Sequence, residues 1–135
     1  MSEAQTPAEY LQIAQDRLED ARELLSARRN AGAYYLSGYG VECSLKSLLL
    51  ERSTPAQRPK VLKFFRGKSG HDVERIKKHL RGRGVRIPAR LTRALYVINT
   101  WSVHVRYDVG PKTGHETQRL IRAVGEIVSW VEAEL

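Results

Sequence analysis

One segment, residues 34–51, constrains the fold of this chain most, because its apolar and its small residues both recur at helical spacing. Three apolar residues stand at i, i+4 and i+7, the spacing of one helix face: Val41, Leu45 and Leu48. Three small residues form a second row on an adjacent face: Gly40, Cys43 and Ser47. Glycine inside a helix costs about 1 kcal/mol relative to alanine, so a packing reason is expected for it. We therefore predict a buried helix whose small face lets another helix backbone come close.

The same helix carries a charged pair, Glu42 and Lys46, four residues apart with the acid first. That order is the favourable one for an ion pair on a helix surface. We predict a surface or interhelical ion pair here, with contact to a ligand as the alternative. Cys43 lies between them and is the chain's one cysteine, so an internal disulfide is excluded.

Three helix starts carry a capping box, in which an N-cap hydroxyl and a carboxylate three residues later satisfy free backbone amides reciprocally. The three N-cap residues are Thr6, Ser69 and Thr113. Asn30 is expected to cap a further helix, and Pro88 to lie in the first turn of another. Helices are therefore expected near residues 7–28, 30–51, 69–82, 88–106 and 113–135, with a long loop over residues 52–68, which contains two prolines.

These elements predict an all-α fold, an antiparallel up-and-down bundle of about five helices forming a single domain over residues 1–135. A chain of this length buries about two-thirds of its unfolded surface. No apolar run reaches the roughly 18 residues of a membrane span. The first residues lack a basic stretch followed by an apolar one, so we expect no secretory signal and a cytoplasmic protein.

The net charge of +8 makes the protein basic, and its charge is unevenly distributed. Residues 52–93 hold 14 lysines and arginines against two acids, whereas the rest of the chain holds 9 basic and 13 acidic residues. A field of this kind attracts anionic partners, nucleic acid above all. We expect the nucleic-acid contacts to come from Lys77, Lys78, Arg81, Arg83 and Arg106. The alternatives are a solvated basic face and a surface for an acidic protein.

An ordered set of three motifs resembles the HEPN domain family (higher eukaryotes and prokaryotes nucleotide-binding). The motifs are Glu42-x-x-x-Lys46 before a leucine run, Gly70-His71-Asp72 at the start of a later helix, and Arg106-Tyr107-Asp108 closing another. The resemblance implies a HEPN-like bundle that binds nucleotide or nucleic acid. It also implies a homodimer and a minimal nucleotidyltransferase as partner in a toxin–antitoxin or defence system.

Ribonucleases of this family carry Arg, four to six residues, and then His, and two such pairs meet across a dimer to cleave RNA without metal. A guanidinium can hold the phosphate with two hydrogen bonds while a histidine exchanges protons. Here eight residues separate Arg106 from the next histidine, His115, so the family spacing is not met. We therefore expect a binding module without ribonuclease activity. The alternatives are a metal-independent endoribonuclease using Arg106 and His115 across a dimer, and a purely structural interaction module.

The remaining chemistry-bearing residues do not group. Four histidines and one cysteine are scattered without metal-ligand spacing, and no phosphate-binding glycine loop follows a strand pattern. We therefore expect no metal site and no cofactor.

Overall fold

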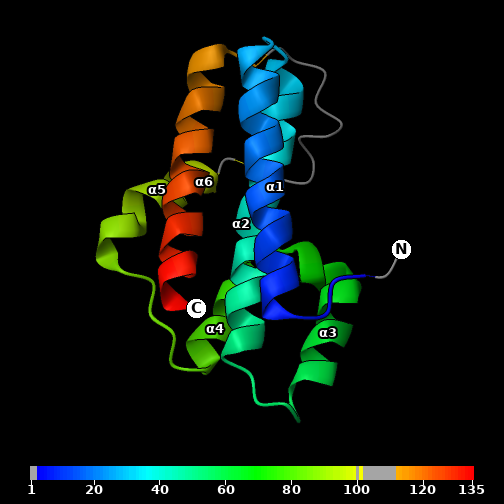
Figure 1. The fold of residues 1–135 in the computed structure, drawn as a ribbon. Coiled ribbons are helices and arrows are strands. Elements are labelled where there is room, and N and C mark those ends of the chain that lie inside the picture. The colour runs from blue at the N-terminus through cyan, green and yellow to red at the C-terminus, as the bar shows by residue number, and fades with distance from the viewer. Residues whose placement is uncertain (1–2, 100, 102–111) are drawn as a thin grey trace.

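The computed structural model describes residues 3–99, 101 and 112–135, and Figure 1 shows their arrangement. All regular structure in this part of the chain is helical, which confirms the predicted all-α bundle. The α-helices are α1 (Pro7–Ser26), α2 (Asn30–Glu51), α3 (Arg58–Arg66), α4 (Val73–Gly82), α5 (Thr92–Ile98) and α6 (Gly114–Glu134). Two short 3-10 turns, η1 (Lys68–His71) and η2 (Ala89–Leu91), precede α4 and α5. No described helix is long and apolar enough to cross a membrane.

Three long helices, α1, α2 and α6, lie side by side and form the body of the bundle (Figure 1). α2 is central: it packs against α1 and α6 along its length and against α4 near its end. Its apolar face is fully buried, as expected for Val41, Leu45 and Leu48. From the later helices Ile98, Leu120, Val124 and Ile127 are buried as well. Leu95 of α5 is only partly buried.

The row of small residues on α2 brings neighbouring helices close. A Cβ added at Gly40 would lie 2.9 Å from Cγ1 of Val124 on α6 and 3.6 Å from the backbone carbonyl oxygen of Ala14 on α1. At one end of the row, Oγ of Ser47 donates a 2.6 Å hydrogen bond to the backbone carbonyl of Pro7 and so joins α2 to the start of α1. The predicted packing reason for a glycine in this helix is confirmed.

A second glycine of α2, Gly38, holds an aromatic side chain. The indole of Trp101 occupies the place where a Cβ at this position would stand. Its Nε1 donates a 3.1 Å hydrogen bond to the backbone carbonyl of Tyr35, and its ring meets that of Tyr39 edge-on at 5.4 Å between centroids. Trp101, which follows α5 in the chain, is therefore held against α2 by ring packing and a hydrogen bond.

The expected loop over residues 52–68 is only partly correct, because residues 58–66 form α3 and the residues before them lack helical structure. Pro59 lies in the first turn of this helix, where a missing N–H is not needed. Val61 and Phe65, four residues apart, are buried against the bundle, and Phe65 meets Tyr10 of α1 edge-on at 5.3 Å. These two buried residues on one face hold α3 against the bundle, although its proline and lysines are typical of a loop.

Two predicted helix caps are also corrected, whereas the capping boxes at Thr6 and Thr113 are confirmed. Asn30 is already helical, and its side-chain amide donates a 3.2 Å hydrogen bond to the backbone carbonyl of Lys112, linking the starts of α2 and α6. Ser69 lies in η1, and α4 is capped instead by Asp72, whose carboxylate accepts a 3.0 Å hydrogen bond from the backbone N–H of Glu74.

Candidate functional site

The predicted catalytic pair is only partly placed. Arg106, and with it Tyr107 and Asp108, lies outside the described residues. His115 is the second residue of α6 and is exposed. The α6 cap is made by the side chains of Thr113 and Glu116, and the imidazole of His115 has no hydrogen-bond partner in the described part of the chain.

Glu42 and Lys46 form the predicted ion pair, but the pair lies within one helix and is buried, whereas a surface or interhelical pair was expected. Nζ of Lys46 donates a 2.9 Å hydrogen bond to Oε2 of Glu42, and the two side chains are 5% and 3% exposed. The pair is covered because it lies on the central helix, where α1 and α3 pack over it. Nζ of Lys46 stands 5.1 Å from the ring centroid of Phe65 and 6.0 Å from that of Tyr10.

His71 connects this ion pair to the surface. Its Nδ1 lies 3.1 Å from Oε2 of Glu42, and its side chain is 55% exposed. The other carboxylate oxygen of Glu42, Oε1, is buried and has no hydrogen-bond partner among the residues that the structure describes. Burial first, and the charge of Glu42 second, raise the pKa of the neighbouring Cys43 thiol to about 11, which disfavours the reactive thiolate form. The opposite charges of Glu42 and Lys46 compensate each other inside the core, and this stabilises the cluster.

Of the four basic residues expected to bind nucleic acid on and just after α4, two are engaged with other described residues of the protein and two are not. Lys77 is tied to Glu74 at 2.9 Å, and Arg83 donates a 3.3 Å hydrogen bond to the backbone carbonyl of His79. His79 is packed on Phe64 with 4.3 Å between ring centroids, and burial lowers the pKa of its imidazole, with neighbouring positive charges adding to the effect. Lys78 and Arg81 remain exposed and without an ion-pair partner in the described residues.

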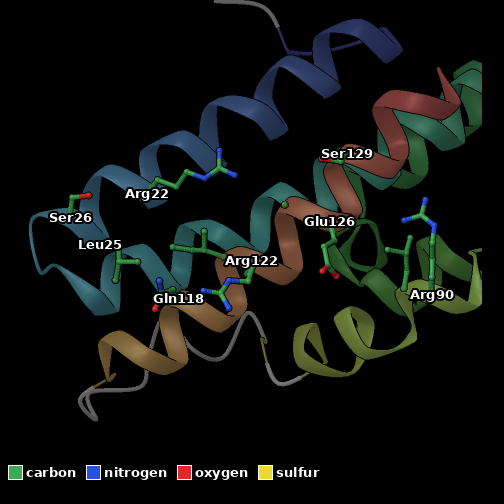
Figure 2. Close-up of a pocket in the computed structure, with 11 residues that line it drawn as sticks. Arg22, Leu25, Ser26, Arg90, Gln118, Arg122, Glu126 and Ser129 are labelled. Atoms are coloured by element: carbon green, nitrogen blue, oxygen red, sulfur yellow. The ribbon is translucent and has the colours of Figure 1, made fainter.

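A different basic surface is found along α6, which we call the arginine groove. It is lined by five arginines: Arg22, Arg90, Arg93, Arg119 and Arg122. Its largest hollow is an open cavity of about 690 Å³ between α1, η2 and α6. Figure 2 shows Arg22 projecting from α1, Arg122 and Glu126 from α6, and Arg90 from the segment before α5.

The groove continues past α5. A second cavity of about 620 Å³ lies between α5 and α6 and shares Arg122 and Glu126 with the first. A third, of about 210 Å³, shares Tyr96 and Arg119 with the second. The three hollows therefore form one surface that follows the exposed side of α6.

The guanidinium groups of this groove are largely uncompensated. Within the described residues, no hydrogen bond or ion pair is found for four of them: Arg90, Arg93, Arg119 and Arg122. Arg22 is held loosely by Glu19 at 3.5 Å. Among the described residues, Glu126 is the one acid that lines the two larger cavities. An arrangement of this kind, with several guanidinium forks around open hollows, can bind phosphates with two hydrogen bonds each.

The sequence contains a signal for this groove in the spacing of its arginines. Arg119 and Arg122 stand three residues apart on α6, as Arg90 and Arg93 do around the start of α5, so each pair lies on one face of the chain. The charge count overlooked the α6 pair because it lies outside residues 52–93, in a part of the chain that is acidic on balance. Only the packing of α5 against α6 brings the two pairs to one surface.

The described residues contain no group of three or more histidines, cysteines or acids placed to hold a metal ion. A family model described as the HEPN domain matches residues 8–134. Among solved structures, the crystal structure of TT1696 from Thermus thermophilus is similar, with a TM-score of 0.66 and 20% sequence identity. The similarity covers 98% of this chain and 100% of that chain, and at this identity it shows a shared fold. No curated protein matches the sequence.

Proposed function

The chain belongs to the HEPN domain family, and from this premise we propose that it is a nucleic-acid-binding module whose phosphate-binding surface is the arginine groove. The observation that carries the proposal is the set of four exposed arginines without a partner among the described residues, aligned along open cavities on α6. Uncompensated positive charge lowers the stability of a folded protein through self-repulsion, and a polyanion relieves that cost.

The groove supports binding better than the α4 face does. Two of the four basic side chains expected to act on and just after α4 are already engaged with residues of that helix, namely Lys77 and Arg83. The groove arginines are instead free to displace counterions from phosphates. Because each phosphate contact changes the logarithm of the binding constant by about −0.7 per logarithm of salt on single strands, four contacts give a slope near −3.

Two matched double variants test which surface binds. Arg119→Ala with Arg122→Ala removes two charges three residues apart on α6, and Lys78→Ala with Arg81→Ala removes two with the same spacing on α4. At 0.1 M salt each lost contact weakens binding about fivefold, so the groove variant is expected to bind single-stranded RNA about 25-fold more weakly, with a slope reduced by about 1.4. Fluorescence anisotropy across a salt series measures both quantities.

The α4 variant is the control, since it lowers the net charge by the same amount. Equal losses in the two variants would show a nonspecific effect of net charge, and a larger loss in the α4 variant would move the site there. The same incubations address catalysis. We expect the RNA to be recovered intact on a denaturing gel, because the Arg-to-His spacing of family ribonucleases is not met. Chelator-insensitive cleavage that is lost in Arg106→Ala and in His115→Ala would establish the endoribonuclease alternative.

We also propose that the chain forms a homodimer and acts with a minimal nucleotidyltransferase in a toxin–antitoxin or defence system; family membership supports this. The small face of α2 does not provide the dimer surface, because α1 and α6 cover it within one chain. Sedimentation at tens of micromolar is expected to give the mass of two chains. The mass of one chain would contradict the dimer, and a genomic neighbourhood without a nucleotidyltransferase gene would count against the partner.

A further inference from the structure

Tyr96 is the one large aromatic side chain that the described structure leaves open to solvent, at 74% exposure. The other described tyrosines are all engaged. Tyr10 packs on Phe65, and Tyr35 and Tyr39 share a 2.8 Å hydrogen bond. Lys112 stands over the ring of Tyr34 at 4.7 Å. Tyr96 has neither a ring contact nor a hydrogen bond with any described residue.

The surroundings of Tyr96 combine an aromatic face with positive charge. It lies on α5 three residues after Arg93, so both side chains occupy the same face of that helix. Together with Arg119 and Arg122 of α6 they line the cavity of about 620 Å³. This volume falls in the range of about 300–1,000 Å³ that holds small ligands. Tyr96 also lines the cavity of about 210 Å³, which is below this range.

Resting on the proposed function, we infer that Tyr96 is a stacking platform for a nucleobase, so that the ligand of the arginine groove is single-stranded nucleic acid. A base in a duplex is stacked between its neighbours and offers no free face to a side chain on a protein surface. A base in a single strand can lay its face on the tyrosine ring while the flanking phosphates meet Arg93 and Arg119. Stacking of this kind tolerates any base, because each base has an aromatic face.

The test separates the base from the phosphates. Three ligands are compared by fluorescence anisotropy: a single-stranded oligoribonucleotide, the same strand with abasic residues at its central positions, and the matching duplex. Tyr96→Ala is expected to weaken binding of the normal strand about tenfold and to change binding of the abasic strand and the duplex less than about twofold. Tyr96→Phe keeps the ring and is expected to bind all three as the unmodified protein does.

The outcomes distinguish this inference from the proposed function. If the unmodified protein binds none of the three ligands, the proposed function fails. If it binds them and Tyr96→Ala has no effect, or weakens all three equally, the stacking role is overturned while binding by the groove stands. If Tyr96→Ala instead lowers the sedimentation mass without selective loss on the normal strand, the residue belongs to a contact between two copies of this chain, which also overturns the inference. Circular dichroism spectra and thermal midpoints confirm that both variants are folded.

Discussion

Lys46→Met is expected to lower the free energy of unfolding by about 3–5 kcal/mol, because it leaves the carboxylate of Glu42 buried without its main partner. Glu42 is 3% exposed, and its Oε1 already lacks a hydrogen bond within the described part of the chain. Among the described residues, the half-exposed ring of His71, whose Nδ1 lies 3.1 Å from Oε2, then remains as the polar partner of that oxygen. The cost is a large share of the 5–15 kcal/mol that stabilises a typical domain. Urea denaturation measures it as a lower midpoint at unchanged slope.

The double variant Glu42→Gln with Lys46→Met is the control for this experiment. It removes both charges, so no uncompensated ion is left in the core, and replacing a buried pair in this way is often close to neutral. We expect the double variant to regain most of the stability lost in Lys46→Met. If Lys46→Met alone costs less than about 1 kcal/mol, the range of an exposed pair, the described burial of the pair is wrong in solution.

Gly38→Ala is expected to cost about 3–5 kcal/mol, the range for losing a buried tryptophan, because the added methyl group and the indole of Trp101 cannot share one place. Trp101 is 7% exposed and donates a hydrogen bond to the backbone carbonyl of Tyr35. Displacing it loses both its packing and this bond. Near-ultraviolet circular dichroism and tryptophan fluorescence report the displacement, and urea denaturation reports the cost.

The matched control for Gly38→Ala is Gly32→Ala in the same helix. A Cβ at Gly32 would meet Cδ1 of Leu24 at 3.5 Å, an ordinary van der Waals contact, and the position is exposed. Because alanine is the better helix former, this variant is expected to gain up to about 1 kcal/mol. Equal effects of the two substitutions would contradict the described seat of Trp101 on α2.

The sequence predicted the parts of the fold that depend on local signals. The periodicity of α2 gave its buried face, and the hydroxyl–carboxylate pairs at Thr6 and Thr113 gave the starts of α1 and α6. The small residue at Gly40 predicted the close approach of another helix, which occurs with both α1 and α6. These signals succeed because each is decided within one or two helical turns.

The caps expected at Asn30 and Ser69 failed locally, because each residue already lies inside a helix or a 3-10 turn, whereas the other failures depend on partners distant in the sequence. The favourable order of Glu42 and Lys46 is the same on an exposed and on a buried helix face, and only the packing of α1 and α3 over the pair decides between them. α3 could not be predicted because Pro59 and the lysines around it are typical of a loop. Only the packing of Phe65 against Tyr10 of α1, far away in the sequence, stabilises the helix. The arginine groove could not be predicted for the same reason, since α1, η2, α5 and α6 supply its charges separately and only their packing joins them.

Nuclear magnetic resonance of the arginine Nε–Hε groups tests most directly where this protein meets nucleic acid. A single-stranded oligoribonucleotide is titrated into the labelled protein at low salt, with each resonance assigned by substitution. We predict that the resonances of the groove shift and broaden first, namely those of Arg90, Arg93, Arg119 and Arg122. Resonances of Arg75, Arg81 and Arg83 on and after α4 are expected to move little. Large shifts on α4 with an unchanged groove would contradict the account.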